Sequence, residues 1–409
     1  MYFSIALTKE TLEEYRALLS NNKLSELDFV FRHKNMPVEV RSFLAAQIKL
    51  RKKAEKKHPN FFKSCCFYLE QALEQSTAYW VARHKAALFQ QNSTLLVCDL
   101  TGGMGAESVA FADNGNQVVY IEPHKELFDI SNYNFERLGL SAQIELMNTN
   151  AEDFLLQNVS AFDLTLLDPD RRAQGVRDFT LENSSPNPLL LEEEILKKSR
   201  KLLVKHSPLI DIQYLREQFN FLQTVFVFSF RNEVKEVTTL HTRGDVNDTK
   251  VVCICINSKG VKSVVAFNEN ADKHITHVNS GCKEYFFEPD KAIIKSGYAS
   301  LYASRLGLES ISPGIPYFTS ENVPHNFIGR IFEVKEVVKY NNQSIKEILN
   351  KYKIVKASIG ARGFSLKADE IEKKFQLKPD DTHHLFFYIN KDGEKEVVLC
   401  ETYLPKASI

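Results

Sequence analysis

Three short segments of this chain carry side chains that could hold a polar ligand. Asp99-Leu-Thr-Gly-Gly-Met-Gly105 joins an apolar run to a stretch typical of a helix, and its glycines let the backbone approach a bound group where a Cβ would collide. Glu122 and Asp168 each end a further apolar run. A carboxylate in the position of Glu122 can accept hydrogen bonds from both hydroxyls of a ribose. Each segment alone is weak evidence, but together they indicate a ligand site where the strands of a sheet end.

These segments are positioned by apolar runs that alternate with helical stretches. The expected strands are 95–99, 117–122, 143–147, 162–168 and 202–206. The expected helices between them are 107–114, 125–138 and 189–201. Strands alternating with helices predict a parallel sheet that is covered on both faces. The pattern therefore predicts a doubly wound, Rossmann-like α/β domain over residues 93–280, which closes with β-rich sequence at 224–231 and 250–257.

The segments on either side of this domain have different patterns. Residues 1–92 predict a helical N-terminal domain that has no catalytic signature of its own. Two small α+β modules are expected after the α/β domain, at 281–335 and 336–409. The first contains an expected helix at 293–306, and the second has the order β-α-β-α-β-β with a hairpin turn at Asn390-Lys-Asp-Gly393.

Charge is balanced over the chain but not along it. The 409 residues include 52 Lys and Arg against 52 Asp and Glu, which excludes a globally basic nucleic-acid binder. The net charge is +6 for residues 1–92, −8 for 93–278 and +2 for 279–409. The segment Lys49 to Lys57 places six positive charges among nine residues, and it fits either a solvated helix or a contact with a polyanion.

Several classes of protein are disfavoured by composition. No apolar run approaches the roughly 18 residues of a membrane span, and the N-terminus lacks the basic flank and cleavage site of a signal peptide. Seven cysteines without framework spacing predict reduced thiols in a cytoplasm. Cys253 and Cys255 share one face of an expected strand but have no partner pair at metal-ligand spacing, so we expect no metal site.

The order of the three ligand segments resembles class I S-adenosylmethionine-dependent methyltransferases. In that fold the glycine loop cradles the methionine half of the cofactor, the acid after the second strand binds the ribose, and a polar residue after the third strand contacts adenine. The resemblance places Asn150-Ala151 at the adenine, with Glu152 and Asp153 as alternatives. The cofactor residues that it implies are Asp99, Thr101, Gly102, Gly103, Gly105, Glu122, Asn150, Ala151 and Asp168.

The alternative ligand for the glycine loop is NAD. Ser108 stands at the third glycine of the dinucleotide fingerprint, which is a weaker match. A dinucleotide brings a pyrophosphate, which the positive end of a helix favours. Here Asp99 precedes the loop and Glu107 lies in the first helical turn, so the approach is acidic. Such an approach suits the cationic sulfonium and ammonium of S-adenosylmethionine better than two phosphates.

The segment Asp168-Pro-Asp-Arg-Arg172 stands where many nucleic-acid methyltransferases have Asn/Asp-Pro-Pro-Tyr/Phe. It lacks the aromatic residue that stacks on a base, and two arginines follow instead. We expect Asp168 to hydrogen-bond the methyl acceptor and Arg171, Arg172 and Lys205 to contact an anionic part of the substrate. Alternatively, the arginines pair with nearby aspartates to hold the loop, and Lys205 ends a strand in solvent.

Motifs outside the cofactor segments narrow the resemblance. Ser184-Ser-Pro186 and Lys205-His-Ser-Pro208 resemble a bacterial family of class I methyltransferases. Glu288-Pro-Asp-Lys-Ala-Ile-Ile-Lys295 is similar to that family's ferredoxin-like segment, and residues 336–409, with Gly360-Ala-Arg-Gly363, resemble its THUMP-like domain.

THUMP domains bind RNA, so this likeness implies an RNA acceptor. Arg362, with Lys356 and Lys367, is the cluster that we expect to face RNA. The alternatives are methylation of a small anionic metabolite or a protein, and a non-catalytic RNA-binding protein with a vestigial cofactor pocket.

Overall fold

A computed structural model describes residues 9–19, 25–90, 92–158, 160–170, 181–244, 248–268 and 281–404. The chain divides into two compact units. The first comprises residues 1–226 and 235–249, and the second comprises 227–234 and 250–409. Each unit has its own hydrophobic core.

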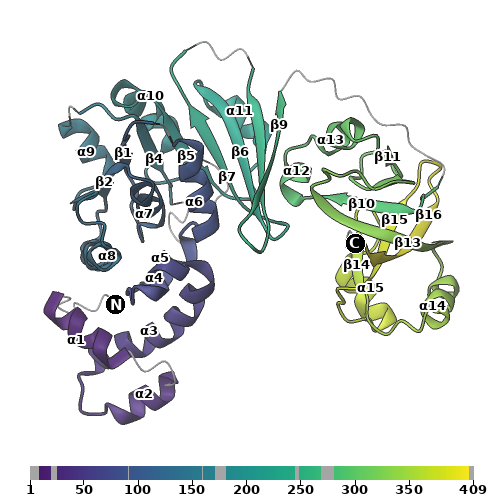
Figure 1. The fold of residues 1–409 in the computed structure, drawn as a ribbon, viewed down its shortest axis with the longest axis horizontal. Helices are drawn as coiled ribbons and strands as arrows, with labels where there is room; N and C mark the ends of the chain where they lie inside the picture. Colours follow the sequence, from purple (N-terminus) through teal and green to yellow (C-terminus); the bar gives the residue numbers. More distant parts are fainter. Residues whose placement is uncertain are drawn as a thin grey trace. The chain divides into compact units, whose positions relative to one another are not determined.

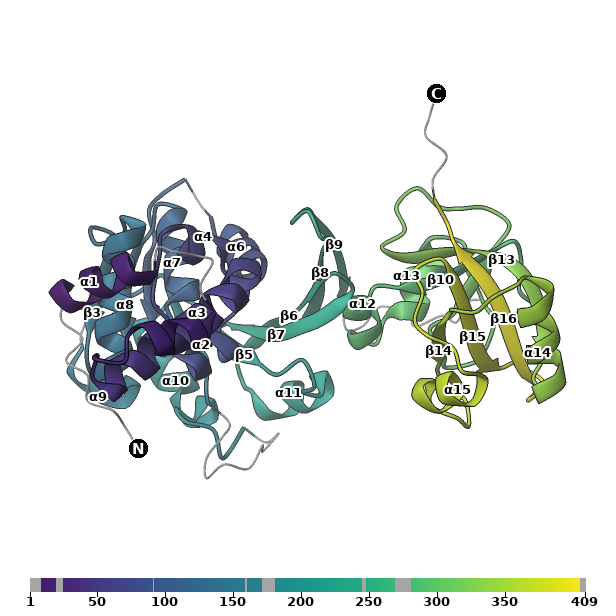
Figure 2. The same ribbon diagram turned by 90° about the horizontal axis from the view of Figure 1, so that it is seen from below.

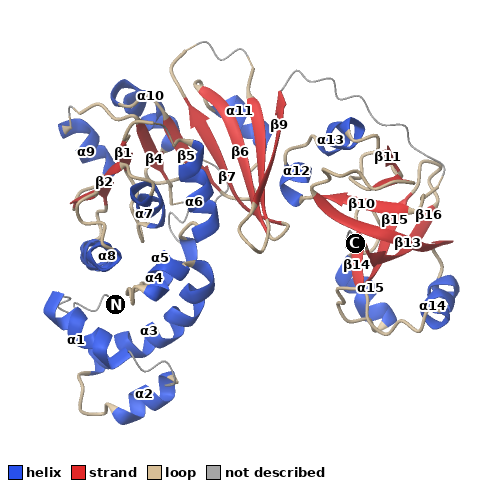
Figure 3. Cartoon of the chain, viewed as in Figure 1, coloured by secondary structure: helices blue, strands red, loops and turns tan. Residues whose placement is uncertain are grey.

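The first unit begins with helices only, as the sequence predicts (Figure 3). These helices are α1 (Lys9–Leu19), α2 (Glu26–Arg32), α3 (Val38–Lys57), α4 (Pro59–Lys63), α5 (Glu70–Gln75) and α6 (Tyr79–Leu88). Ser25 caps α2 in a reciprocal capping box with Asp28. Buried residues of α1 to α3 pack with Ile130 and Tyr133 of the following α/β layer, so the helical segment shares a core with that layer.

The α/β layer follows with strands and helices in alternation. Its elements are β1 (Leu96–Asp99), α7 (Ala106–Asp113), β2 (Gln117–Ile121), α8 (Lys125–Leu138), β3 (Ile144–Met147), α9 (Ala151–Gln157), β4 (Leu164–Leu167), α10 (Pro188–Lys198), β5 (Leu202–His206), α11 (Ile212–Gln218), β6 (Leu222–Phe230) and β7 (Glu233–His241). In the first unit the strand order is β3-β2-β1-β4-β5-β7-β6. The first five strands in this order are parallel, which confirms the doubly wound arrangement.

Helices cover both faces of this sheet. α9 and α10 pack on one face around Cys98, Ile121 and Leu202 (Figure 1). α7 and α8 lie on the other face, where Tyr120 of β2 meets the ring of Phe135 at 5.2 Å between centroids. The parallel strands therefore point their carboxyl ends to one edge of the layer, which is where the predicted ligand residues lie.

Strand β7 is an addition to the sequence prediction. It runs antiparallel to β5, so the sheet is not parallel throughout. Arg231 and Asn232, between β6 and β7, have φ values of 54° and 58°. A turn with two residues of positive φ normally signals itself by Asn-Gly or Asp-Gly, and this one has no glycine. The hairpin was therefore not recognisable from turn residues.

The second unit contains β8 (Lys250–Ile256), β9 (Lys262–Asn268), β10 (Tyr285–Pro289), α12 (Lys291–Lys295), α13 (Ala299–Arg305), β11 (Glu309–Ser310), β12 (Phe318–Ser320), β13 (Gly329–Lys339), α14 (Asn342–Lys351), β14 (Ser358–Ala361), α15 (Ala368–Phe375), β15 (His383–Ile389) and β16 (Lys395–Thr402). The helix expected at 293–306 is two helices, because Gly297 adopts a φ of +81° and ends the first. From β13 onward the order is the expected β-α-β-α-β-β.

One sheet of the second unit has the order β11-β12-β10-β13-β16-β15-β14. α14 and α15 pack on one face of it around Ile345, Ile371 and Leu385 (Figure 2). Phe286, Phe332 and Phe386 form a second aromatic core, which joins β10 to β13 and β15. Strand β13 crosses the expected boundary between residues 335 and 336, so the two expected modules share this sheet.

Candidate active site

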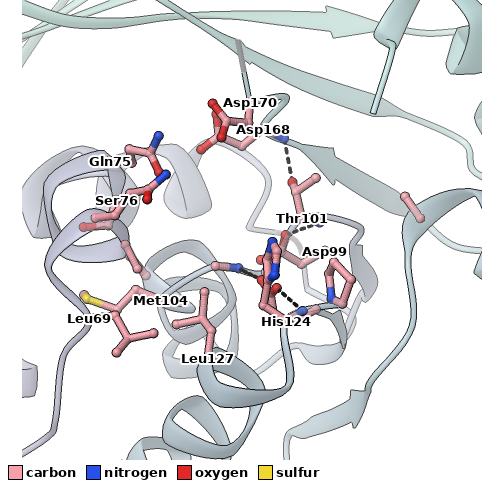
Figure 4. Close-up of a pocket in the computed structure, with 18 of the residues that line it drawn as sticks. Leu69, Gln75, Ser76, Asp99, Thr101, Met104, His124, Leu127, Asp168 and Asp170 are labelled. Carbon is pink, nitrogen blue, oxygen red and sulfur yellow. Dashed lines mark hydrogen bonds between the residues drawn. The ribbon is translucent and has the colours of Figure 1, made fainter. Parts of the chain in front are cut away.

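A cavity of about 600 Å³ lies at the carboxyl ends of β1, β2 and β4 (Figure 4). The expected cofactor residues that line it are Asp99, Thr101, Gly102, Gly103, Glu122, Asn150, Ala151 and Asp168. Gly105 is the one expected cofactor residue that does not line it. The fold thus brings residues from the ends of three strands and from the starts of α7, α8 and α9 to one cavity.

The glycine loop is pressed against aromatic rings beneath it. A Cβ on Gly102 would lie 2.1 Å from the Tyr120 ring, and one on Gly105 would lie 2.4 Å from Phe135. Gly105 also has a φ of +77°, which other residues rarely adopt. The Tyr120 hydroxyl donates a hydrogen bond to the carbonyl of Gly103 at 2.6 Å. The role of Gly105 is therefore to let the loop pack closely, while Gly103 faces the cavity.

Asp99 is buried at the end of β1. Its carboxylate accepts hydrogen bonds from the Ser108 hydroxyl at 2.5 Å and from the Thr101 amide at 3.3 Å. Burial, followed by the nearby charge of Glu107, raises the pKa of Asp99 to about 7. A cationic ligand beside Asp99 would favour the ionised form, so this carboxyl is suited to bind positive charge.

Glu122 follows β2, and two backbone amides hold its carboxylate. The Gly103 amide donates to Oε2 at 3.0 Å, and the His124 amide donates to Oε1 at 2.8 Å. Burial raises the pKa of Glu122, although both amides favour its ionised form. Each carboxylate oxygen has a second lone pair, so Glu122 can still accept bonds from ligand hydroxyls.

Asn150 caps the N-terminus of α9. Its Oδ1 accepts a hydrogen bond from the Asp153 amide at 2.7 Å, and its Nδ2 donates to the Asp153 carboxylate at 2.8 Å. Asn150, Ala151 and Glu152 line the cavity. The side chain of Asp153 is thus committed to the cap, whereas Glu152 faces the cavity beside Asn150.

Asp168 directly follows β4 and contacts both the glycine loop and β5. Its amide donates to the Thr101 hydroxyl at 2.7 Å, and its Oδ2 pairs with Lys205 Nζ at 2.5 Å. Lys205 Nζ also donates to the carbonyl of Gln75 at 3.2 Å. Burial raises the pKa of Asp168, and Lys205 opposes that rise. Lys205, expected to contact an anionic part of the substrate, therefore has a carboxylate and a carbonyl as partners. Arg171 and Arg172 lie outside the described residues.

A second buried lysine lies behind this pair. Lys85 of α6 is 2% exposed and bonds to Glu107 and to Glu236, the latter at 2.5 Å. Burial opposes the charge on Lys85, but the two carboxylates outweigh it and raise the pKa of Lys85. Burial also opposes the charge on Glu107, and Lys85 and Lys205 outweigh it and lower the pKa of Glu107. The network stays ionised because each charge has an opposite neighbour.

The sequence prediction missed part of the cavity wall. The segment from Leu69 to Thr77, which we call the α5 strap, supplies Leu69, Gln71, Ala72, Gln75, Ser76 and Thr77. Figure 4 shows Gln75 and Ser76 across the cavity from Asp99 and Thr101. Lys57 Nζ fastens the strap by donating to the carbonyls of Leu73 and Glu74, each at 2.8 Å. No local motif marks these residues, because their role depends on packing between distant segments.

The charge of the cavity wall decides which ligand fits. The acidic residues that line the cavity are Asp99, Glu107, Glu122, Glu126, Glu152, Asp168 and Asp170. Lys125 is the single lysine among the lining residues, and no arginine is among those that the structure describes. Such a wall suits a cationic ligand and disfavours the two phosphates of a dinucleotide. Within the described ranges, no group of three or more His, Cys, Asp or Glu is arranged to hold a metal ion.

Two of the six basic residues in the segment Lys49–Lys57 form ion pairs within the molecule, and a third is bonded to backbone carbonyls. Lys49 pairs with Glu70, and Lys53 pairs with Glu70 and Glu74. Lys57 is bound to the strap, whereas Lys52 and Lys56 are exposed. This distribution favours the solvated-helix interpretation over a contact with a polyanion.

Comparison with known proteins identifies the same fold and the C-terminal domain. Residues 329–402 match the family model described as THUMP domain-like. Two Mycobacterium tuberculosis proteins, described as uncharacterised S-adenosylmethionine-dependent methyltransferases, are each 24% identical over 327 residues, which cover 78% of this chain and 84% of theirs. A crystal structure from Porphyromonas gingivalis, described provisionally as a methyltransferase, superposes with a TM-score of 0.84 at 24% identity, and it covers 99% of this chain and 100% of that one. In the part of the chain that is described, no helix has the length and hydrophobicity needed to cross a membrane.

Proposed function

We propose that this chain, a class I S-adenosylmethionine-dependent methyltransferase with a THUMP-like domain, methylates RNA. The observation that carries the proposal is the THUMP-like match at residues 329–402 in a chain that also has the acidic cavity at the strand ends. THUMP domains occur in RNA-modifying enzymes, which supports RNA as the acceptor by analogy with the module.

The residues of the cavity fit the cofactor that the family uses. Asp99 and Gly103 would hold the methionine half, Glu122 the ribose, and Asn150 with Ala151 or Glu152 the adenine. When bound, S-adenosylmethionine supplies an activated methyl group on a positively charged sulfur. The acidic wall supports this assignment, because it matches that charge and disfavours a pyrophosphate.

On the acceptor side, Asp168 is the residue that we assign to the reaction. Its Oδ2 is bonded to Lys205, and the carboxylate lines the cavity, so Oδ1 is available to accept an N–H or O–H of the acceptor. The pairing supports a positioning role for Lys205, which holds Asp168 and the strap together. Arg171 and Arg172 follow directly in the chain, and in this proposal they contact RNA phosphate.

Two other functions are consistent with parts of the chain. A small anionic metabolite or a protein would use the same cofactor cavity, and only the THUMP-like domain argues against it. A non-catalytic RNA-binding protein would not need Asp168 to be held by a buried lysine, so that pairing favours an enzyme. All seven cysteines are free thiols, which supports our proposal that the enzyme works in the cytoplasm.

The deciding experiment is a methyl-transfer assay with radiolabelled S-adenosylmethionine on total RNA from a strain that lacks the gene. We expect label in RNA with the wild-type chain and none with Asp168→Asn, and nucleoside mass spectrometry then identifies the product. Label in metabolites or proteins, with none in RNA, would show that the chain is a methyltransferase whose acceptor is not RNA. Absence of measurable cofactor affinity in calorimetry would refute the enzyme itself.

A further inference from the structure

The second unit contains a charged cluster that the proposed reaction does not use. Glu288, at the end of β10, is 4% exposed and lies between two arginines. Arg330 donates to Glu288 Oε2 through both Nε, at 2.9 Å, and Nη2. Arg362 approaches the other oxygen, with its Nε 3.4 Å from Oε1. We call Arg330 and Arg362, with the carboxylate between them, the arginine pair.

The backbone is shaped to bring these three residues together. Glu288 and Arg330 are direct partners across β10 and β13, whereas Arg362 arrives from the loop after β14. A Cβ on Gly329 would lie 2.3 Å from the Glu288 carbonyl oxygen, and one on Gly360 would lie 2.9 Å from the Tyr317 hydroxyl. Glycine beside each arginine therefore permits an approach that any side chain would block.

The cluster has more positive charge than the buried carboxylate needs. One guanidinium neutralises Glu288, and the second leaves a surplus of one positive charge. Among the residues that the structure describes, no other carboxylate lies within ion-pair distance of either arginine. The side chains of Arg330 and Arg362 are 40% and 35% exposed, so their remaining N–H groups can reach solvent.

The two guanidiniums are also held in fixed orientations. Arg330 uses two N–H groups on one carboxylate oxygen and lies over the Phe332 ring at 5.4 Å from its centroid. Arg362 is held by its ion pair with Glu288. Arginines that are already oriented lose less conformational freedom when they bind a phosphate.

We propose that Arg330 and Arg362 form a phosphate-binding site that holds the RNA backbone on the second unit. The planar fork of a guanidinium matches two phosphate oxygens, and a pair with surplus charge provides donors for one phosphate group. The choice of RNA as the source of the phosphate rests on the proposed function. The Glu288 motif and the Gly360-Ala-Arg-Gly363 motif then contribute to the same site, because Glu288 orients the Arg362 side chain that the second motif supplies.

The test measures RNA binding by filter retention over a range of salt concentrations, using the full chain and total RNA from the strain that lacks the gene. We expect Arg362→Gln to weaken binding several-fold, and Arg330→Gln with Arg362→Gln to weaken it about tenfold or more at low salt. Each lost phosphate contact should reduce the slope of log affinity against log salt by about 0.7 to 0.9. Calorimetric affinity for S-adenosylmethionine should not change.

A matched control is Arg305→Gln, which removes the same charge from an exposed arginine of the same unit. Arg305 donates to the Ala266 carbonyl and lies over the Phe267 ring, away from the arginine pair. It should leave RNA affinity and salt slope unchanged. Arg362→Lys keeps the charge without the fork and should give an intermediate affinity. If Arg362→Gln lowers the melting temperature but leaves RNA affinity and slope unchanged, the pair is a structural brace and the inference is overturned.

Two further comparisons test whether the phosphate belongs to RNA, and distinguish failure of this inference from failure of the proposed function. If inorganic phosphate or a mononucleotide competes as well as RNA on an equal phosphate basis, the site serves a free phosphate compound and the RNA assignment is overturned. If RNA binds through the two arginines but receives no methyl group, the inference stands and the proposed acceptor fails. If the wild-type chain methylates RNA but binding is independent of both arginines, the inference fails and the function stands.

Discussion

The cofactor cavity of the first unit and the arginine pair of the second both contain buried carboxylates, but their charge surpluses are opposite. Around the cavity, two lysines form ion pairs with three carboxylates: Lys85 with Glu107 and Glu236, and Lys205 with Asp168. Further acidic residues line the wall. In the second unit, the single carboxylate of Glu288 serves two guanidiniums. A chain with equal numbers of acidic and basic residues therefore contains one region suited to a cation and another suited to an anion.

The two regions also differ in how strongly they depend on each ion pair. The lysines of the first unit are almost fully buried, so each is needed to keep its partners charged. The arginines are partly exposed, and Glu288 would keep one partner if the other were lost. Substitutions of the buried lysines should therefore affect folding and catalysis, and a single substitution of either arginine should affect binding alone.

The largest effect is expected for Lys85→Met. It leaves Glu107 and Glu236 close together and buried without their shared cation. We expect the free energy of unfolding to fall by about 3–5 kcal/mol, as measured by urea denaturation. Lys53→Met, at an exposed pair with Glu70 and Glu74, is the control and should cause no measurable change. Equal stability of the two variants would mean that the buried network contributes little.

The next effect concerns Asp168→Asn. The substitution keeps the shape of the side chain but removes the charge that pairs with Lys205 and that, in our proposal, accepts a bond from the methyl acceptor. We expect turnover to fall about 100-fold or more, with calorimetric affinity for the cofactor within twofold of the wild type. Unchanged turnover would remove Asp168 from the reaction.

A smaller effect is expected for Asp99→Asn on cofactor binding. The neutral amide cannot attract a positive ligand group, although its oxygen can still accept from the Thr101 amide and its NH2 can donate to the Ser108 hydroxyl. Loss of one charged hydrogen bond should weaken the affinity roughly tenfold to fiftyfold in calorimetry. Asp211→Asn, at the exposed N-terminus of α11 where an amide oxygen can cap the helix equally well, is the matched control and should bind normally. A similar loss in both variants would show that the effect is not local.

The pH dependence of cofactor binding should follow the same carboxyl. Burial raises the pKa of Asp99 to about 7, so the group is mostly ionised at pH 8 and mostly protonated at pH 6. Because the ionised form attracts a cation, affinity should be about fivefold to tenfold lower at pH 6 than at pH 8. Asp99→Asn should lose this dependence. A dependence that persists in the variant would assign it to another group.

The smallest effect is expected for Lys52→Gln with Lys56→Gln, which removes two exposed charges from α3. The neighbouring Lys49 and Lys53 are already paired with acids, and we expect the two exposed lysines to be solvated in the complex as well. RNA affinity in the filter assay should change less than twofold. A loss as large as that of the arginine variants would make α3 a second RNA contact and would weaken the contrast between the two units.

The sequence was sufficient for those parts of the fold that depend on local pattern. The parallel strands and the alternating helices follow from runs of apolar residues, and β5 and α8 have the predicted bounds. β7 was missed because the turn at Arg231 and Asn232 contains no glycine. The single helix expected at 293–306 was wrong, because it passes over Gly297. Local patterns therefore predict elements well and their breaks poorly.

The candidate site was predictable where function is carried by backbone geometry and strand ends. The residues Asp99, Gly103 and Glu122 were expected together, and they line one cavity. The α5 strap and Lys85 could not be predicted, because nothing near them in sequence distinguishes a wall residue from an ordinary helix residue. Arg362 was expected to face RNA, but its ion pair with Glu288 could not be predicted, because the two residues meet only when distant strands form one sheet.

The bond between Lys205 and the Gln75 carbonyl joins residues that are 130 positions apart. During synthesis on a ribosome, the α5 strap is translated well before β5. A nascent chain that ends before β5 therefore lacks the hydrogen bond between Lys205 and the Gln75 carbonyl. The α5 strap is then fastened to the sheet by the last of the parallel strands to be translated. Cofactor that is present during translation would stabilise the chain once β5 has docked on the strap. Truncations from either end of the first unit should yield chains that fold partly but do not bind the cofactor.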